Sequence, residues 1–298
     1  MVLKFFKMKE KKALGGKILA ERMQIELARR VGLLKEKFPK LPIFAIVLVG
    51  DDPSSLVYIS RKIEVAKKLG IEAKLIKLPH NSTQGDIVNE VQKANNSPEI
   101  SGIIVQMPLP EHINSLEICN LISANKDIDG LCAENAGKLA LGFNFADISH
   151  LPCTPSACIY LLESNGILLK SKRCLVINRS NIVGKPLANM LLRQDAIVQI
   201  SHSRDENISE LTRAADVIFS AVGVPKFITS DMMKSGSVLV DIGISRGFDG
   251  KIAGDIDESC AKIASFISPV PGGVGPLTIA FLMKNIVKSM ENYCNSLM

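Results

Sequence analysis

The sequence lacks the features that would place it among membrane, secreted or fibrous proteins. No apolar run approaches the roughly 18 to 20 residues needed to span a bilayer, and the best is the strand-length stretch at residues 44–49. No low-complexity tract or fixed-period repeat occurs, and the basic opening lacks the apolar segment of a signal peptide. The seven cysteines form no CxxC pair, so we expect reduced thiols, a cytoplasmic location and no membrane partner.

Several catalytic signatures are also missing. There is no GxSxG elbow and no Walker loop, which argues against an acyl-hydrolase and a P-loop kinase. The four histidines have no partners at metal-ligand spacing, so we assign no metal. A net charge of +6 is modest and spread along the chain, so it gives only weak support for a nucleic-acid partner, and we expect none.

Strand-length and helix-length patterns alternate through the first half of the chain. Residues 17–38 have helical apolar spacing, and Asp52 followed by Pro53 is a typical helix start. Strand patterns occur at 44–50, 73–78 and 102–108, with further helices at about 83–95 and 113–123. Strands separated by helices predict parallel crossovers. The Gly-, Asn- and Asp-rich segment 126–142 breaks this rhythm and should lead out of a first domain.

A second α/β series follows, with a helix after 152–157, a strand at 173–178, a turn at 179–184, a helix at 185–194 and a strand at 196–202. Two more strands, at 216–223 and 237–244, make this a Rossmann-like unit. We therefore predict two α/β domains with a cleft between them: residues 1–148, completed by a C-terminal helix at 278–298, and residues 149–277.

Polar side chains at three places could carry chemistry in the first domain. Tyr58 and Lys62 lie one helical turn apart and could reach one ligand, although a tyrosine at the core margin and a solvated lysine would look the same. Gln106 ends a predicted strand, where it could bond a lysine or a heterocycle or simply satisfy loop backbone. Asp127 and Asp129 could accept the donor groups of a pterin, or serve only as turn formers before a glycine.

The turn at 178–184 lies where a dinucleotide pyrophosphate would meet a helix N-terminus. It retains only Gly184 of a GxGxxG pattern, so a plain connecting loop remains the alternative. The next strand ends in His202, Ser203 and Arg204 rather than an acid, and with Arg179 nearby this favours the 2'-phosphate of NADP over NAD.

Seven segments in order resemble the bifunctional methylenetetrahydrofolate dehydrogenase/methenyltetrahydrofolate cyclohydrolase family over nearly the whole chain. They are SSLVYISRK, GIIVQMPLP, KDIDG, PCTP, NRSNIVGKP, DIGI and PVPGGVGP. The resemblance implies NADP-dependent oxidation of 5,10-methylenetetrahydrofolate, hydrolysis of the product to 10-formyltetrahydrofolate, and a homodimer formed through an edge strand of the second domain.

The resemblance also implies roles for individual residues. Tyr58 would stack on the folate, Lys62 would be the catalytic lysine, Gln106 its hydrogen-bonded partner and Asp129 the carboxylate that holds the pterin. Further folate contacts are implied at Val105, Met107, Pro271, Gly272, Gly273 and Gly275. The cofactor contacts implied are Asn178, Arg179, Ser180, Ser203, Arg204 and Ile244.

The chain departs from the family pattern at two places. Asn178 replaces the usual glycine, and we expect the turn to survive because asparagine tolerates unusual backbone angles. Residues 203–211 include acidic side chains where the family tends to have a basic residue, which leaves NAD open as a cofactor. A non-catalytic dinucleotide sensor and a different small-substrate dehydrogenase are the alternative functions.

Overall fold

The computed structural model describes residues 15–246 and 252–298, and the basic N-terminal extension lies outside these ranges. The chain divides into two compact units. The first, here the α9 unit, comprises Leu19–Ala157 and Leu277–Met298; the second, here the β4 unit, comprises Cys158–Pro276 and the segment ending at Ile18. Each unit is described by itself below.

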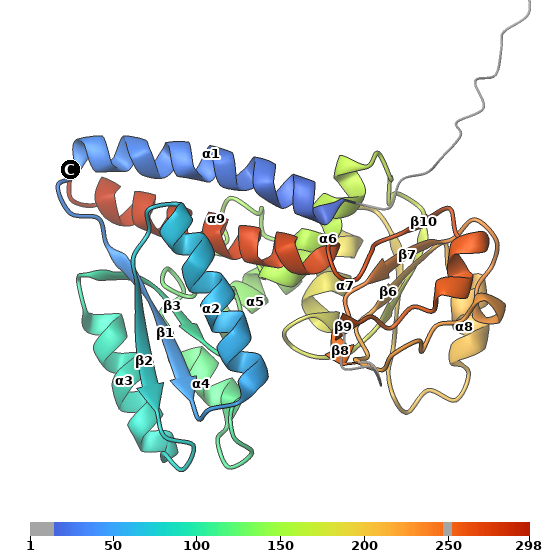
Figure 1. The fold of residues 1–298 in the computed structure, drawn as a ribbon, viewed down its shortest axis with the longest axis horizontal. Helices are drawn as coiled ribbons and strands as arrows, with labels where there is room; N and C mark the ends of the chain where they lie inside the picture. The colour runs from blue at the N-terminus through green and yellow to red at the C-terminus, as the bar shows by residue number, and fades with distance from the viewer. Residues whose placement is uncertain (1–14, 247–251) are drawn as a thin grey trace, which may run out of the picture. The chain divides into compact units, whose positions relative to one another are not determined.

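The α9 unit is built on a parallel sheet of order β2-β1-β3 (Figure 1). Its strands are β1 (Ile43–Val49), β2 (Ala73–Leu78) and β3 (Ile100–Val105). The helices associated with it are α1 (Gly16–Lys37), α2 (Pro53–Lys68), α3 (Gln84–Asn96), α4 (Ser115–Leu121), α5 (Ala133–Ala140), α6 (Cys153–Ser164) and α9 (Val274–Asn295). Of these, α1, α6 and α9 also include residues of the β4 unit.

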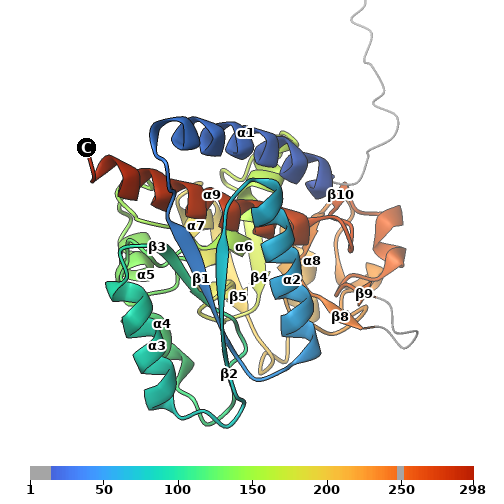
Figure 2. The ribbon, with the colours of Figure 1, turned by 60° about the vertical axis from the view of Figure 1, so that its left-hand side comes forward.

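Alternate residues of β1 face two separate cores, because successive side chains of a strand point to opposite faces. Phe44, Ile46 and Leu48 pack with residues of α1, α2 and α9, whereas Ala45 and Val47 pack with residues of α3 and α4. Helix α9 runs beside α1 in both Figure 1 and Figure 2. The last helix of the sequence therefore belongs to the core of the first sheet.

The β4 unit contains a five-stranded parallel sheet of order β10-β7-β6-β4-β5. Its strands are β4 (Arg173–Ile177), β5 (Ile197–Ser201), β6 (Val217–Ser220), β7 (Val238–Asp241) and β10 (Phe266–Ile267). Its helices include α7 (Gly184–Leu192), α8 (Ile208–Ala214) and the short 3-10 helices η1 (Ser230–Met232) and η2 (Glu258–Lys262). A short antiparallel pair is formed by β8 (Ser245–Arg246) and β9 (Ile252–Ala253). These two parallel sheets confirm the α/β class expected from the sequence.

Two element predictions need correction. The segment at 126–142 was expected to be irregular, but it contains α5, because Leu139 and Asn135 give that helix a buried side. Helix α6 begins at Cys153, within the PCTP motif rather than after it, since a proline in the first helical turn needs no backbone N–H partner. No described helix is both long enough and apolar enough to cross a bilayer.

Candidate functional site

The start of α2 sets the direction of Tyr58 and Lys62. Asp52 caps the helix by accepting a hydrogen bond from the backbone N of Ser55 at 2.7 Å, and Pro53 occupies the first turn. Tyr58 and Lys62 follow one turn apart, and both are half-buried. Burial raises the pKa of the Tyr58 hydroxyl, with a smaller opposing effect from the charge of Arg61. Tyr58 is therefore neutral at physiological pH and can act as a hydrogen-bond donor or a stacking ring.

The carboxyl end of β3 brings Gln106 to Lys62. The Lys62 Nζ atom donates to Gln106 Oε1 at 3.0 Å, while Gln106 Nε2 donates to the carbonyl of Met107 at 2.6 Å. The backbone N of Gln106 bonds the carbonyl of Val47 on β1 at 2.9 Å. Because its NH₂ group is occupied by backbone, the amide presents its oxygen to the lysine. Gln106 thus bonds a lysine through its oxygen and satisfies loop backbone through its nitrogen, so both roles expected from the sequence apply.

Asp129 lies at the same sheet edge as Gln106. Asp127 forms a parallel bridge with Ile103 of β3, so Asp129 and Gln106 both follow this bridge in the same direction. Burial raises the pKa of the Asp129 carboxyl, and the positive charge of Lys62 partly offsets this rise. The Lys62 ammonium group thus bonds a neutral amide and acts electrostatically on the carboxylate of Asp129.

The two aspartates of KDIDG have different surroundings. Asp127 is 1% exposed, and its carboxylate accepts hydrogen bonds from the backbone N of Cys132 at 2.8 Å and from Asn135 Nδ2 at 2.9 Å. Asp129 is half-buried. Asp127 is therefore used inside the protein, and only Asp129 remains a candidate for ligand contact.

The residues on either side of Gln106 are apolar and contribute to the core of the α9 unit. Val105 is 4% exposed, and Met107 packs against the same cluster of buried residues. Any contact between Val105 and a ligand would therefore come from its backbone.

In the β4 unit, the turn from β4 to α7 is held together by Asn178. Its Oδ1 accepts from the backbone N of Ser180 at 2.8 Å and of Gly184 at 3.1 Å, and its Nδ2 donates to the carbonyl of Ala221 at 2.7 Å. Gly184 has no room for a Cβ atom, which would lie 2.0 Å from the Asn178 carbonyl oxygen. The turn thus closes tightly over the start of α7.

The expected reason for tolerating Asn178 was wrong. Among the described non-glycine residues, positive φ angles occur at Ser171, Asp195 and Lys226, so Asn178 is not in the left-handed region that favours asparagine. Its amide side chain supplies the hydrogen bonds that hold the turn. Asparagine is accommodated here through its side chain rather than through its backbone freedom.

Cationic and hydroxyl side chains lie at the carboxyl ends of β4 and β5. Ile177 pairs with Ser201, so Arg179 and Ser203 each follow two residues after this pair, at one edge of the sheet. Arg179, Ser203 and Arg204 are exposed. This edge, with its tight glycine turn and exposed guanidinium groups, fits a polyanionic dinucleotide that carries an additional phosphate.

The acidic side chain closest to this edge in sequence is already engaged. Asp205 accepts hydrogen bonds from Ser201 Oγ at 2.8 Å and from the backbone N of Asn207 at 3.0 Å. The bond from Asn207, and then that from Ser201, holds the pKa of Asp205 below its usual value. Asp205 thus folds back onto β5, which lessens its conflict with a bound phosphate.

Two buried carboxylates that the sequence reasoning missed lie behind the predicted nicotinamide segment. Asp255 Oδ2 accepts from Ser220 Oγ at 2.8 Å and from the backbone N of Val222 at 2.6 Å, and its Oδ1 accepts from two more backbone N–H groups. Asp241 Oδ1 accepts from the backbone N of Asp255 at 3.0 Å. Both carboxylates are almost fully buried, and Ile244, three residues after Asp241, is 45% exposed. In the sequence, each of these aspartates stands close to a glycine, in Asp241–Gly243 and in Gly254–Asp255. This pattern could have singled them out, but only the fold brings the two segments together.

The glycine-rich loop at 269–276 is tied to the start of α1. Lys17 donates its backbone N to the carbonyl of Gly272 at 3.1 Å, and Gly272 has a φ of +109° that favours glycine. A Cβ atom on Gly273 would lie 2.5 Å from the carbonyl oxygen of Pro269. Pro271 belongs to the same loop, whose backbone requires glycine at 272 and 273, while Gly275 lies in the first turn of α9.

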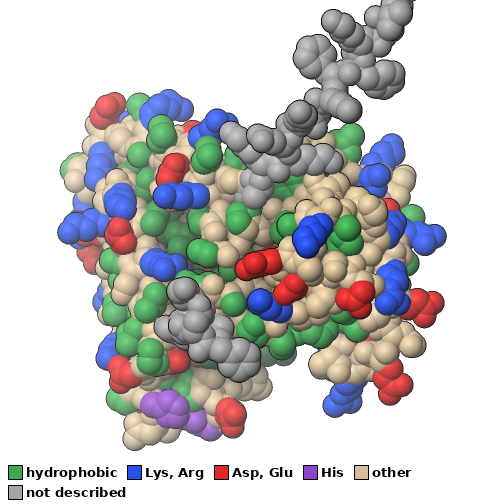
Figure 3. All heavy atoms as spheres, turned by 45° about the vertical axis from the view of Figure 1, so that its right-hand side comes forward, with side chains coloured by type: hydrophobic (Ala, Val, Ile, Leu, Met, Phe, Trp, Pro, Cys, Tyr) green, Lys and Arg blue, Asp and Glu red, His purple; other side chains and the backbone are tan. Residues whose placement is uncertain are grey.

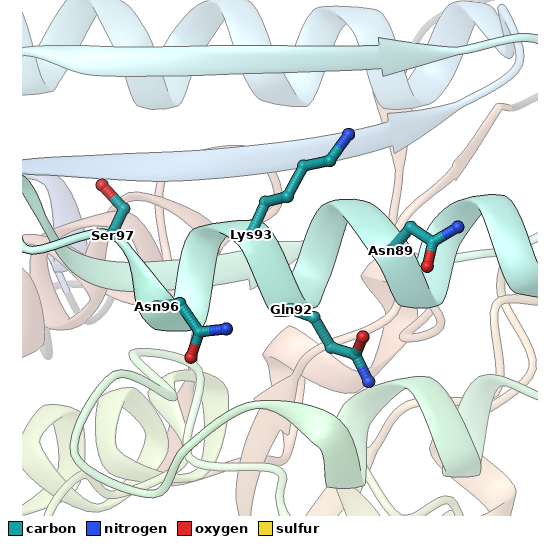
Figure 4. A pocket seen from close by; sticks show the side chains of 5 residues that line it. All are labelled: Asn89, Gln92, Lys93, Asn96 and Ser97. Carbon is teal, nitrogen blue, oxygen red and sulfur yellow. The ribbon is translucent and has the colours of Figure 1, made fainter.

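A surface hollow occurs on α3, away from all the residues predicted from the sequence. Figure 4 shows that the side chains lining it point in different directions and come from α3 and the residue that follows it. Lys93 forms an ion pair with Glu90. These side chains do not converge on one ligand. Within the described ranges, no cluster of three or more potential metal-binding side chains occurs.

Comparison with known proteins matches both parts of the chain to one family. Residues 14–129 match the tetrahydrofolate dehydrogenase/cyclohydrolase catalytic domain, and residues 152–294 match the NAD(P)-binding domain of the same family. The bifunctional protein FolD of Acetivibrio thermocellus is 42% identical over 283 residues, which is 95% of this chain and 98% of that protein.

Two solved structures are similar over almost their whole length. The bifunctional methylenetetrahydrofolate dehydrogenase/cyclohydrolase of Campylobacter jejuni is 40% identical with a TM-score of 0.90, covering 94% of this chain and 99% of that one. The Trypanosoma brucei enzyme, solved with NADP and an inhibitor, is 32% identical with a TM-score of 0.89, covering 96% and 99%. The chain described here belongs to the tetrahydrofolate dehydrogenase/cyclohydrolase family.

Proposed function

We propose that this chain oxidises 5,10-methylenetetrahydrofolate to 5,10-methenyltetrahydrofolate with NADP and hydrolyses that product to 10-formyltetrahydrofolate. Membership of the family across both domains supports the pair of reactions. The observation that carries the residue assignment is the 3.0 Å bond between Lys62 and Gln106, with Asp129 close enough for the charge of Lys62 to act on it.

For the oxidation, the protein supplies alignment. The methylene carbon lies between two nitrogens, so loss of a hydride leaves a delocalised cation and requires little further activation. Bound NADP supplies the hydride acceptor. Asn178 and Ser180 shape the turn that would hold its phosphates, Arg179, Ser203 and Arg204 would bind the ribose phosphate, and Ile244 would border the nicotinamide.

For the hydrolysis, Lys62 is the proposed proton carrier. Water adds to the methenyl carbon, the carbon–N5 bond breaks with its electron pair remaining on N5, and N5 takes up a proton while the water-derived oxygen loses its protons to become the formyl oxygen. The reaction consumes one water and releases one proton. Lys62 Nζ, oriented by Gln106 Oε1, is placed to transfer protons, and Tyr58 would stack on the folate beside it.

Asp129 would accept the N–H donors of the pterin. Burial raises the pKa of this carboxyl and the charge of Lys62 lowers it, and a carboxylate in such surroundings can accept strong hydrogen bonds from the N–H groups of a heterocycle. The backbone of Val105, with Met107 and the loop residues Pro271, Gly272, Gly273 and Gly275, would complete the folate contacts.

The test is a Lys62→Met substitution with Lys67→Met as its control, because Lys67 is exposed on the same helix. We expect the cyclohydrolase rate, followed by decay of the methenyl chromophore, to fall about 10²- to 10⁴-fold in Lys62→Met. NADP binding measured by calorimetry should not change in either variant. An unchanged hydrolysis rate in Lys62→Met removes Lys62 from the mechanism.

The same assay separates this proposal from a non-catalytic dinucleotide sensor. A sensor would bind NADP but form no NADPH when methylenetetrahydrofolate is added, whereas the proposed enzyme forms NADPH only in the presence of that folate. Parallel reactions with NAD measure the cofactor preference.

We also propose that the chain forms a homodimer through β5. This strand is at the edge of its sheet, and Leu192, Ile197 and Ile200 are 57%, 59% and 42% exposed at or near it. An unpaired apolar edge favours association with a second copy. Ile197→Glu should therefore shift the molecular mass in light scattering towards that of the monomer, and an unchanged mass would exclude this interface.

We place the protein in the cytoplasm, without a nucleic-acid partner. All seven cysteines are free thiols, as a reducing compartment would keep them. Acidic and basic side chains are interspersed on the face drawn in Figure 3 rather than gathered into one basic surface. Nucleic-acid binding would require a concentrated basic stripe.

A further inference from the structure

Asn285 on α9 joins two distant segments of the α9 unit. Its side chain is buried, with 7% exposure. Its Nδ2 atom donates to the carbonyl of Ile128 at 2.8 Å and to the carbonyl of Leu151 at 2.9 Å. An amide NH₂ has two hydrogens, so both are used in holding main-chain carbonyls. The same nitrogen lies 3.6 Å from Cys153 Sγ.

The two carbonyls belong to the segments that surround Asp129. Ile128 directly precedes Asp129, and Leu151 lies two residues before Cys153. The Cys153 thiol lies 3.6 Å from the carbonyl oxygen of Ile128, the residue beside Asp129. Asn285 thus connects the backbone beside Asp129 with the segment that carries Cys153.

These two segments approach each other closely. Gly130 has a φ of +70°, and a Cβ atom there would lie 2.7 Å from the carbonyl carbon of Leu151 and 2.8 Å from the nitrogen of Pro152. The turn that carries Asp129 therefore lies directly against the backbone of the Leu151 segment. Asn285 is the polar side chain that bonds both sides of this contact.

We infer that Asn285 is a positioning residue that fixes the Asp129 carboxylate with respect to Lys62, and through it the pterin of the folate substrate. This inference rests on the function proposed above, in which Asp129 holds the pterin. Asn285 itself does not contact the substrate: its two amide hydrogens are already bonded to carbonyls in the protein interior. A misplacement of about 1 Å at a binding group can reduce an enzymatic rate by about 10²-fold.

Ser289 provides a matched control one turn further along α9. Its hydroxyl is buried and bonds the carbonyls of Ser101 and, at 3.1 Å, of Asn125. Ser289 thus also ties α9 to the sheet and to the 123–130 segment, but it anchors a carbonyl four residues before Asp129. Loss of either side chain removes buried hydrogen bonds, and only Asn285 bonds the residue next to Asp129.

The test compares Asn285→Ala and Ser289→Ala in the full-length chain. Thermal unfolding should show that both variants are folded and destabilised, and calorimetry should show that both bind NADP as the unmodified protein does. For Asn285→Ala we expect the KM for methylenetetrahydrofolate to rise about 10- to 100-fold. Its pH profile of kcat/KM should also shift, because the pKa of Asp129 depends first on its burial and then on its position relative to Lys62, Asp127 and Cys153. Ser289→Ala should keep the original KM and pH profile.

The outcomes separate the two proposals. An unmodified protein without folate-dependent NADPH formation overturns the proposed function itself. An active protein in which Asn285→Ala leaves the KM and the pH profile unchanged overturns the positioning role alone, as does a Ser289→Ala variant with equal kinetic effects. If Asn285→Ala does not fold, Asn285→Ser, which retains a shorter donor, replaces it: its KM should exceed that of the unmodified protein, and an unchanged KM counts against the inference.

Discussion

Lys62 is half-buried and bonded to Gln106, whereas Arg179 and Arg204 follow the ends of β4 and β5 and are exposed to solvent. The two sets of cations differ in surroundings because their proposed tasks differ. Proton transfer requires one group in one place, so the lysine is oriented by a neutral amide. Binding a flexible polyanion requires accessible charge that adjusts to the ligand. The comparison teaches that the proposed catalytic cation is half-buried and the proposed binding cations are exposed.

The anions show the reverse pattern. Asp129 of the α9 unit is half-buried and available to a ligand, while Asp241 and Asp255 of the β4 unit are 4% and 0% exposed and bond backbone N–H groups. In the β4 unit these two carboxylates thus face the protein interior rather than the sheet edge that would meet a phosphate. An inward carboxylate can organise a loop without repelling an anionic ligand at the surface.

The largest expected effect comes from disturbing the inward carboxylates. Asp255→Asn places an NH₂ group against backbone N–H donors. The backbone of Gly243 is also close, because a Cβ atom on Gly243 would lie 2.0 Å from Asp255 Oδ1, so the new side chain has little room to rearrange. We expect a loss of roughly 2 to 5 kcal/mol in the free energy of unfolding, measured in urea. Asp231→Asn is the control: Asp231 is exposed, so this substitution should leave the free energy of unfolding close to that of the unmodified protein. Equal losses would show that burial of Asp255 has no special role.

A smaller effect should appear as a pH dependence of stability. Burial raises the pKa of Asp241 to about 6 from an ordinary value of 3.8, with a further rise from the charge of Asp255. Between about pH 4 and 6 the folded protein therefore binds more protons at this site than the unfolded chain, and the free energy of unfolding falls as the pH rises. The full cost of ionisation is on the order of 3 kcal/mol.

Asp241→Asn should remove this contribution. The free energy of unfolding of the variant, minus that of the unmodified protein, should increase from pH 4 to pH 6 and then level off. Taking the difference cancels groups that titrate in both proteins, such as His150, whose pKa burial lowers. A difference that stays constant across this range would show that Asp241 is already ionised at pH 4.

The smallest effect tests the exposed cations. Arg179→Ala should weaken NADP binding about 10-fold and NAD binding less, because only NADP has the additional phosphate that a guanidinium can bind. Calorimetry with both cofactors measures this difference, and Lys262→Ala, which removes another exposed cation of the β4 unit, should leave both affinities unchanged. Equal weakening of NADP and NAD would assign Arg179 to a shared phosphate instead.

Local sequence patterns predicted the elements that depend on neighbouring residues. The Asp52-Pro53 start of α2 and the strand at Ala73–Leu78 agree with the structure, because capping and apolar spacing act over a few residues. The pairing of Lys62 with Gln106 was expected only from the family resemblance, since 44 residues separate them and no local rule places one beside the other. The folate and cofactor contacts themselves remain predictions.

The sequence by itself determined the alternation of strands and helices, the spacing of Tyr58 and Lys62, and the cationic ends of β4 and β5. These follow from short-range periodicity and composition. The tertiary structure alone decided that the Asp127 carboxylate is bonded inside the protein, that Asp241 and Asp255 meet, and that Asn285 holds the backbone beside Asp129. Such contacts depend on which distant segments the packed core brings within hydrogen-bond distance, and sequence spacing carries no record of that distance.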